Sequence, residues 1–451
     1  MAIVAVSLAG RVNLWGAEPG VSYHRDILPI LKRSCTGCHH PGKLKGELDL
    51  TTYAALAKGG KHGAAFKSGD PKGSELVEQI SGAEPSMPKE GDALTKDEIA
   101  LFERWIGEGA KDDSPADTAR VFTAEHPPEY SAPPVISAMA LSPDGSLLAV
   151  SGYHEVLLHK PDGGGLVARL VGQSPRIESL TFSPDGKWLG VAGGAPARFG
   201  EIQIWDVKRR EQAKSFKIST DSLYGISFSP DAESVAVGGA DKSVRVIAVA
   251  DGKELMKFDN HSDWVFSTTF TQDGKRIVSG SRDRAMKLID KSNGQFIDDV
   301  NKLLEGVLCM ARNPKKDEVI YGGDLGTPRI YKISDNQNRG GGDTARDANL
   351  IKELERQPGA VRAVAYSPDG NQVAVSGGPG DVRVYKADGT KVSSLKGMEG
   401  YTFSLAFTLE KNLLLTGGFD GRIRIFDAGT GAMVTNFIPV TLQSPRVAAA
   451  K

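Results

Sequence analysis

A short turn motif recurs along most of this chain, and its spacing limits the folds that the chain can adopt. The motif reads LSPDG at residue 141, FSPDG at 182, FSPDA at 228, FTQDG at 270 and YSPDG at 366, with weaker copies RNPKKD at 312 and FTLEK at 407. Successive copies lie 41 to 54 residues apart, and four of the six gaps are 41 or 42 residues. Because proline sets φ and Asp-Gly completes a turn, each copy predicts a tight turn between two strands.

Apolar segments typical of strands surround each turn. Segments such as VAVGGA and LLLTGGF follow the turn, segments such as IQIWD and RIRIFD form a third strand, and LVARLVG or AMVTNFI form a fourth. One four-stranded unit cannot bury both of its faces alone, but seven units stacked around an axis can. The repeat therefore predicts a seven-bladed β-propeller over residues 135–440, with an open all-β array or sandwich as the alternative. The last unit has its own outer strand, so the first segment is not required to close the ring.

The repeat resembles the WD-repeat family over residues 135–439, in a degenerate form. Only one unit ends in Trp-Asp, at Trp205 and Asp206. The unit with His261, Ser279 and Asp283 keeps part of the structural hydrogen-bond set of that family, but Ile289 stands where the Trp would be. The resemblance implies that these residues hold the fold and take no part in catalysis.

The first part of the chain has a different sequence pattern, which predicts helices in residues 21 to about 112. The segment SYHRDILPILKRSC has a helical grouping of apolar residues, with Asp26 placed to cap it. In LTKDEIALFERWIGEGA, Thr95 and Glu98 form a capping box, and Gly107 and Gly109 supply a stop. Two helices and much loop make a small core, so we expect something large and apolar inside this region.

The stretch RSCTGCHH places Cys35 and Cys38 two residues apart, with His39 directly after them. Covalent haem attachment needs two thiols and an adjacent histidine in this C-x-x-C-H spacing. A zinc site would need four ligands, and His40 and His62 are not in a paired spacing with the motif. A redox dithiol of the thioredoxin type would lie in a βαβ setting, which the sequence does not show. The motif favours haem, with zinc and redox thiols as alternatives.

Haem iron bound by one histidine takes a second axial ligand, and Met87 is the leading candidate. It lies in EPSMPKEG, between two prolines and just before the last helix, where the loop is stiffened. A His/Met pair raises the potential relative to a bis-His pair. The rival ligands are His62, His24 and His40, and the alternative role for a lone methionine is core packing.

The N-terminal region resembles the small c-type cytochromes, and more closely the planctomycete-type cytochrome c domain. The resemblance covers residues 21 to 111 and includes YHRDILPIL, CTGCH, GELDL, SGDPKGSELVEQI and SMPKEGDALTKDEIALFERWIGEGA. It implies one haem c held through thioethers by Cys35 and Cys38, with His39 proximal and Met87 distal. Relatives often have a second proline where Lys89 stands. Trp105 resembles an aromatic residue that packs near haem, although helix packing explains it equally well.

The remaining segments complete a two-domain plan. We expect a signal-peptide remnant or disordered tail at 1–20, a cytochrome c domain at 21–112, a linker at 113–134, the propeller at 135–440 and a disordered tail at 441–451. The apolar start MAIVAVSLAG lacks a basic beginning, so it fits a secretory signal loosely. Haem c attachment implies export to the periplasm or an equivalent compartment. No apolar run is long enough to span a bilayer.

The net charge and the motifs limit the classes of function that this chain can have. The formal net charge is −1, which leaves no basic excess for binding nucleic acid. We expect an electron-transfer cytochrome whose propeller is a platform for a redox partner protein or assembly, docking on the propeller or the haem edge. The alternative is an oxidoreductase whose propeller binds a substrate or second cofactor and passes electrons to the haem. A haem-based sensor is a third reading. No nucleotide loop, nucleophile or other catalytic constellation is evident, so the question of enzymatic activity stays open.

Overall fold

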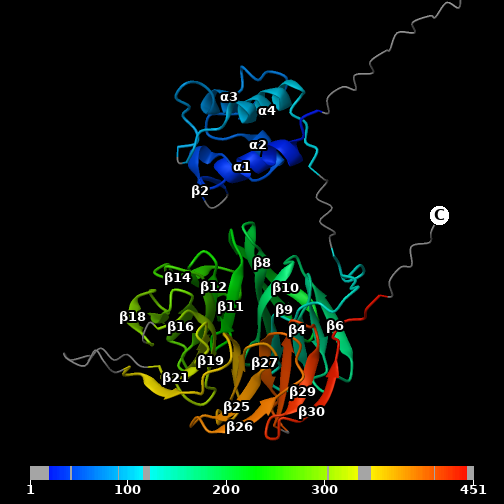
Figure 1. Cartoon of the computed structure of the whole chain (residues 1–451), viewed down its shortest axis with the longest axis vertical. Coiled ribbons are helices and arrows are strands. Elements are labelled where there is room, and N and C mark those ends of the chain that lie inside the picture. Colours follow the sequence, from blue (N-terminus) through cyan, green and yellow to red (C-terminus); the bar gives the residue numbers. More distant parts are fainter. Residues whose placement is uncertain are drawn as a thin grey trace, which may run out of the picture. The chain divides into compact units, whose positions relative to one another are not determined.

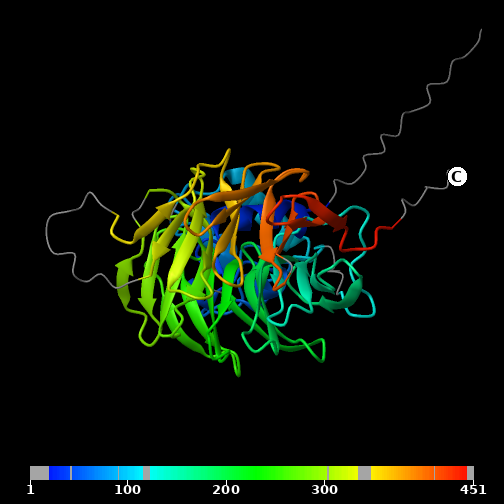
Figure 2. The same cartoon turned by 90° about the horizontal axis from the view of Figure 1, so that it is seen from below.

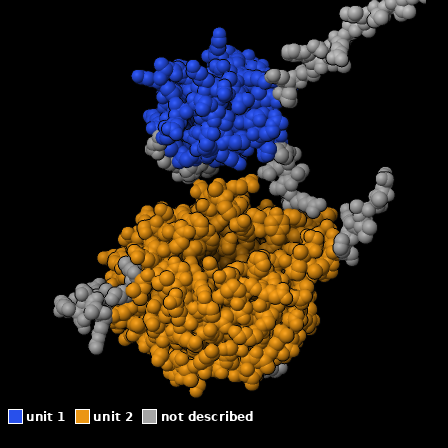
Figure 3. Space-filling model, in the orientation of Figure 1, with its two compact units in different colours: residues 1–120 blue, residues 121–451 orange. Residues whose placement is uncertain are grey.

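The computed structural model divides the chain into two compact units, residues 1–120 and 121–451 (Figure 1, Figure 3). The residues that it describes are 20–40, 43–89, 91–114, 122–301, 304–333, 347–410 and 412–443. The sequence predicted a helical region followed by a seven-bladed β-propeller, and the structure confirms both parts. Each unit is described by itself below.

The N-terminal unit is built from short helices joined by loops. In chain order its elements are a π-helical turn η1 (Tyr23–Ile27), α1 (Leu28–Ser34), β1 (His39–His40), β2 (Lys43–Leu44), a 3₁₀ turn η2 (Lys45–Glu47), α2 (Tyr53–Lys58), α3 (Glu75–Ile80) and α4 (Lys96–Gly107). No helix of the described residues is long and apolar enough to cross a membrane. The sequence analysis missed α2 and α3 because each has only six residues, too few to show a helical period.

The first helical segment begins one turn earlier than predicted. Ser22 is its N-cap, and its hydroxyl accepts a hydrogen bond from the Arg25 amide at 2.9 Å. The prediction that Asp26 caps the helix is wrong in position, because Asp26 lies inside the first turn. Its carboxylate instead accepts a hydrogen bond from the Ser22 amide at 2.8 Å, so the Ser22 and Asp26 side chains each satisfy one backbone donor at the start of the helix.

The last helix begins and ends as predicted. The Thr95 hydroxyl accepts from the Glu98 amide at 3.3 Å, and the Glu98 carboxylate accepts from the Thr95 amide at 2.9 Å. The helix ends at Gly107, and Gly109 has a φ of 102°, which favours glycine. Local side-chain chemistry therefore sets both ends of α4.

Aromatic side chains fill much of the core of this unit. Tyr23, Phe102 and Trp105 are each about 1 % exposed. The Trp105 ring lies 5.2 Å from the Phe66 ring and 5.5 Å from the Tyr23 ring, centroid to centroid. Its indole N–H donates to the Lys111 carbonyl at 3.0 Å, which secures the end of α4. Trp105 thus packs helices together.

The second unit consists of seven four-stranded antiparallel sheets (Figure 1, Figure 2). The innermost strands are β3 (Met139–Leu141), β7 (Arg176–Phe182), β11 (Leu223–Phe228), β15 (Val265–Phe270), β19 (Val307–Arg312), β23 (Val361–Tyr366) and β27 (Thr402–Phe407). The second strands are β4 (Leu148–Ser151), β8 (Trp188–Ala195), β12 (Ser234–Gly239), β16 (Arg276–Ser281), β20 (Glu318–Gly323), β24 (Gln372–Gly377) and β28 (Leu413–Gly418).

The third strands are β5 (Glu155–His159), β9 (Phe199–Asp206), β13 (Val244–Ala248), β17 (Met286–Asp290), β21 (Arg329–Lys332), β25 (Val382–Lys386) and β29 (Ile423–Asp427). The outer strands are β6 (Leu166–Val171), β10 (Glu211–Ser219), β14 (Glu254–Phe258), β18 (Phe296–Asp299), β22 (Leu350–Glu353), β26 (Lys391–Leu395) and β30 (Met433–Phe437). Each blade is one continuous stretch of chain, and the innermost strands of neighbouring blades contact one another around the whole ring.

The recurring turn motif has one hydrogen-bond pattern in five blades. In the turn at Ser229, its hydroxyl donates to the Asp231 carboxylate and accepts from the Ser234 amide at 3.0 Å, while Asp231 accepts from the Glu233 amide at 3.0 Å. Equivalent bonds form at Ser142, Ser183, Thr271 and Ser367. The motif therefore repeats because each residue type in it satisfies a backbone or side-chain partner of the turn.

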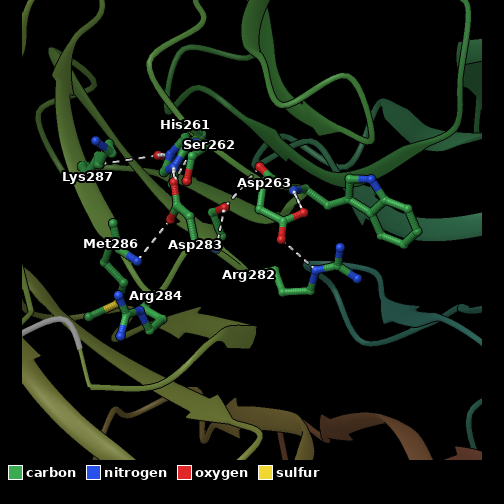
Figure 4. A network of polar contacts seen from close by, with 12 residues as sticks. His261, Ser262, Asp263, Arg282, Asp283, Arg284, Met286 and Lys287 are labelled. Carbon is green, nitrogen blue, oxygen red and sulfur yellow. Dashed lines mark hydrogen bonds and ion pairs between the residues drawn. The ribbon is translucent and has the colours of Figure 1, made fainter. Parts of the chain in front are cut away.

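The fourth blade contains the predicted hydrogen-bond set (Figure 4). His261 bonds through Nδ1 to Asp283 at 2.8 Å and through Nε2 to the Ser279 hydroxyl at 2.8 Å. Asp283 also accepts from the Ser262 and Ala285 amides, both at 3.0 Å. Burial raises the pKa of Asp283, but the hydrogen bond and charge of His261 outweigh burial and lower this pKa to about 2. These contacts tie the loop before β15 to the loop before β17.

Four other blades have an ion-paired arginine at one shared register position. Lys287 lies opposite Ser279 in the register of blade four, and the corresponding residues are Arg245, Arg329, Arg383 and Arg424. These arginines pair with Asp241 at 2.7 Å, Glu305 at 2.5 Å, Asp381 at 2.9 Å and Asp420 at 2.6 Å, respectively. The degenerate repeat thus keeps a polar contact near the start of the third strand and changes its chemistry.

The ring closes between the seventh and first blades without a shared strand. The Ile136 amide donates to the Gly418 carbonyl at 3.0 Å, and buried apolar residues of both blades form one cluster. The prediction left open a strand at RVFT (120–123). Phe122 and Thr123 are not in a strand, and Arg120 and Val121 lie outside the described residues. Closure therefore combines this packing with single main-chain hydrogen bonds across the seam.

His159 lies at this seam and should make the stability of the propeller depend on pH. Its Nε2 donates to the Pro439 carbonyl at 2.9 Å, its ring packs on Phe437, and the residue is 4 % exposed. Burial lowers the pKa of His159 below its ordinary value of 6.5. The unfolded chain takes up a proton below about pH 6.5 when the folded protein does not, so the free energy of unfolding falls as pH falls below that value.

We expect His159→Gln, which keeps a donor for Pro439, to reduce this loss of stability between about pH 6.5 and 5. Urea unfolding followed by tryptophan fluorescence at several pH values measures it. Carboxylates with a lowered pKa change the free energy of unfolding only at lower pH. Their effect should be the same in the variant and the natural protein, so it serves as an internal reference. Equal slopes for the variant and the natural protein in this window would contradict the assignment.

Candidate functional site

The C-x-x-C-H motif lies on one tight turn at the end of α1. Cys35 is the C-cap of α1, and its amide donates to the Leu31 carbonyl at 2.8 Å. The amides of Cys38 and His39 both donate to the Cys35 carbonyl, at 3.1 and 3.2 Å. His39 then begins β1, where its carbonyl accepts from the Leu50 amide at 3.0 Å. The backbone therefore fixes the three predicted residues relative to one another.

An ion pair joins the motif to the last helix. Arg33, on the final turn of α1, bonds to the Glu98 carboxylate at 2.5 Å. Glu98 is also the residue that completes the capping box of α4. The pair is solvent-exposed on the Arg33 side, so its contribution to stability is small. Its consequence is positional, because it holds the end of α1 against the start of α4.

The two cysteines of the motif are free thiols and are half-buried. Cys35 packs against the apolar core of the unit. Burial raises the pKa of the Cys35 thiol to about 11, against a smaller opposing effect of the Arg33 charge. In the chain without a cofactor, this burial favours the protonated thiol of Cys35 at neutral pH.

His39 contains a polar atom without a partner among the described residues. The residue is half-buried, and its Nδ1 is buried and makes no hydrogen bond. A buried unpaired nitrogen normally costs free energy, so its presence marks a functional position or a missing partner. The imidazole of His39 is therefore a candidate to bind a cofactor, which is a group that the protein chain itself does not supply.

Met87 is held near the same core by the end of α3. Its amide donates to the Gln79 carbonyl at 2.9 Å, and the Ser86 hydroxyl bonds to the Gln79 side chain. The Met87 side chain is half-buried and packs against the apolar cluster to which Cys35 also belongs. The structure thus brings the predicted thioether to the core that borders the motif, although α3 itself was not predicted.

The rival ligands are placed differently. His24 and His62 are exposed to solvent. The backbone of His40 pairs with Lys43 in the short β1–β2 ladder, and its side chain lies outside the description. Met87 therefore remains the leading candidate for a second axial position.

The donor set fits a haem. The Cys35 thiol and the Met87 thioether pack against one apolar core, as do the half-buried side chains of Leu48, Phe66, Ile99 and Leu101. Backbone hydrogen bonds hold Cys38 and His39 on the turn that follows Cys35. Within the described ranges, no three His, Cys, Asp or Glu side chains are grouped to hold a metal ion. A porphyrin provides four nitrogen ligands, so the protein needs to provide only one or two ligands to haem iron.

Comparisons with known families agree with this division. Residues 35–91 match the family model for planctomycete cytochrome C. Residues 210–247, 252–290, 348–386 and 389–427 match the WD domain, G-beta repeat. Each WD match begins at the outer strand of one blade and ends in the third strand of the next. The chain thus joins a planctomycete-type cytochrome c domain to a propeller of WD repeats.

The curated relatives resemble the repeats. An uncharacterised WD repeat-containing protein of Synechocystis is 28 % identical over 120 residues, which is 26 % of this chain and 33 % of the relative. Protein groucho of Drosophila melanogaster is 30 % identical over 128 residues, 28 % of this chain and 17 % of the relative. Superkiller complex protein 8 of Dictyostelium discoideum is 30 % identical over 96 residues, which is 21 % of this chain and 31 % of the relative. The matched stretches span a third or less of these relatives.

The burial of Cys35 predicts slow alkylation before any cofactor is attached. In a Cys38→Ser protein made without haem attachment, about a thousandth of Cys35 is thiolate at pH 8 if its pKa is about 11. We expect iodoacetamide to label Cys35 slowly at pH 8 and faster up to pH 11, as measured by mass spectrometry. A Cys35→Ser, Cys38→Ser protein reports Cys309 alone. Labelling of Cys35 at pH 8 at the rate found in urea would contradict this prediction.

Proposed function

We propose that the N-terminal unit carries one covalently bound haem c and transfers electrons. Cys35 and Cys38 would hold the haem through thioethers, and His39 and Met87 would be the axial ligands of its iron. The proposal depends on one observation: a C-x-x-C-H turn is fixed by backbone hydrogen bonds at an apolar core against which Met87 also packs. When bound, the haem supplies a one-electron store.

The protein's own residues would set the properties of that store. The half-buried Leu48, Phe66, Ile99 and Leu101 exclude water from the cofactor, and a less polar site favours the reduced state. A thioether from Met87 favours the reduced state further, relative to a second imidazole. The backbone bond from Met87 to Gln79 holds the loop that presents the thioether. Since attachment of haem c takes place outside the cytoplasmic membrane in bacteria, we also propose a periplasmic or equivalent location.

The haem assignment has a direct test in protein matured in an export host. Denatured, acid-acetone-washed protein should keep one haem per chain, measured as the pyridine haemochrome, and Cys35→Ser, Cys38→Ser should abolish this. Met87→Ala should keep the haem, lose the weak red absorption band of the oxidised state and lower the midpoint potential. His62→Ala is the matched control, because His62 is exposed.

Two results would contradict parts of the assignment. Washed protein without pigment would exclude a covalent haem. A Met87→Ala protein with unaltered spectrum and potential would remove Met87 as the distal ligand, and natural protein without the red band whose spectrum changes in His62→Ala would assign that position to His62.

We further propose that a redox partner or assembly docks on one face of the propeller. Strands alternate direction within each blade, so the loops between second and third strands share one end of the ring with the loops that join blades. Exposed apolar side chains lie on these loops: Tyr153 at 50 %, Leu325 at 54 % and Phe419 at 63 %. Arg282 stacks on Trp264 at 4.5 Å on the same face. Aromatic residues and arginine are enriched where partners bind.

The near-neutral charge of the chain supports contact of this kind over electrostatic steering. We expect Phe419→Asp to lower the rate of haem reduction by solubilised membranes of the source organism several-fold, without changing the haem spectrum. Leu255→Asp is the control, since Leu255 is 46 % exposed on the outer strand β14. Stopped-flow absorbance measures both rates. Equal rates for Phe419→Asp and the natural protein would place the docking site elsewhere, such as the haem edge.

A further inference from the structure

Six of the innermost strands contain a β-bulge near their start. In each of these strands the register shifts directly after the first paired residue, and the next residue stands outside the ladder. A bulge leaves this residue unpaired and changes the direction of its side chain. The bulges lie at the end of the ring where the loops join the blades, which is the face proposed for docking. The six bulge residues are Glu178, Tyr224, Phe266, Leu308, Arg362 and Phe403.

Aromatic side chains from neighbouring blades meet at this face. The Tyr224 and Phe266 rings lie 5.1 Å apart, centroid to centroid, although they belong to the third and fourth blades. The Trp264 ring lies 5.7 Å from the Tyr224 ring. All three residues are half-buried, so part of each ring is accessible to a ligand.

Glu178, the bulge residue of the second blade, is a carboxylate without a partner. It is half-buried, and among the described residues it makes no hydrogen bond or ion pair. Burial raises the pKa of Glu178, and the charge of Arg176 opposes this effect only in part. Burial and then the charge of Glu178 raise the pKa of Tyr224, so the carboxylate lies near the aromatic rings. A carboxylate that has lost water without gaining a donor would be stabilised by a bound cation.

The adjacent pair of aromatic ring and carboxylate already holds an arginine of this chain (Figure 4). The Arg282 guanidinium stacks on the Trp264 ring at 4.5 Å and bonds to the Asp263 carboxylate at 2.8 Å. A planar guanidinium can stack on a ring and donate to a carboxylate at the same time. Tyr224 and Glu178 offer the same two partners, but no arginine or lysine of the described ranges stacks on that ring or bonds to that carboxylate.

We propose that Tyr224 and Glu178 bind the guanidinium of an arginine side chain on the partner protein that docks on this face. The inference rests on the docking proposal and names the chemistry of its anchor. Charge complementarity selects this occupant, because an anionic or apolar group would leave Glu178 unpaired. The basic bulge residue, Arg362, does not fill the site, since it lies four blades further on and its guanidinium is 5.7 Å from the Tyr401 ring.

Saturation-transfer NMR with N-acetyl-arginine N-methylamide tests the site in the full-length protein. We expect a dissociation constant on the order of millimolar, because one side chain makes few contacts. The citrulline analogue has nearly the same shape without the charge, and it should bind at least about fivefold more weakly. Glu178→Gln should weaken binding of the arginine probe by a similar factor.

Glu233→Gln is the matched control, because it removes an exposed carboxylate from the turn between β11 and β12 and should leave probe binding unchanged. Circular dichroism confirms that both variants are folded. Binding of the arginine probe that Glu178→Gln leaves unchanged would overturn the proposal. The absence of saturation transfer at about 20 mM probe would overturn it as well.

Stopped-flow reduction of the haem by solubilised membranes separates this inference from the docking proposal. Glu178→Gln should lower the rate several-fold, as Phe419→Asp should. A lower rate in Phe419→Asp alone would support docking on this face and overturn the arginine anchor. Probe binding that depends on Glu178, with neither variant changing the rate, would support the guanidinium site and overturn docking of the redox partner on this face.

Discussion

A four-stranded sheet with two apolar faces must bury both of them, and in this protein the last sheet buries one face against the sixth sheet and the other against the first. Ile136, Met139 and Leu148 of the first blade pack with Leu415, Ile423 and Ile425 of the seventh in one buried cluster. Each fully buried aliphatic side chain contributes about 1.5–3 kcal/mol relative to exposure. No strand is shared between the ends of the chain, so this packing acts together with single main-chain hydrogen bonds, such as the one from the Ile136 amide to the Gly418 carbonyl.

The polar contacts of the propeller show how a degenerate repeat keeps its geometry. His261 links Ser279 and Asp283 in the fourth blade, and an arginine–carboxylate pair occupies the related position in others. In the second blade the Trp205 indole donates to Gln203, which in turn donates to Glu201. In each case a side chain of a central strand bonds to buried acceptors, so loops and strands stay in register although the residues differ.

The N-terminal unit has few residues with which to build a core, so its stability depends on large buried side chains. Tyr23, Phe102 and Trp105 bury large rings, and one hydrogen bond from Trp105 to Lys111 secures the chain after α4. The expectation that the small core needs a large apolar body is met in part by these rings. Cys35 and Met87 are among the half-buried apolar side chains that pack against this core.

Local sequence was enough to predict the elements with strong local chemistry. The turn motifs, the capping box of Thr95 and Glu98, and the haem-type spacing of Cys35, Cys38 and His39 are patterns in which neighbouring residues satisfy each other. Short helices such as α2 and α3 and the capping of η1 by Ser22 could not be read, because six residues show no period and several polar side chains compete for one cap. Tertiary structure alone placed Met87 against the core that Cys35 also contacts, and brought His159 to the Pro439 carbonyl where the ring closes. Those results depend on contacts between residues far apart in the chain, which a local pattern does not encode.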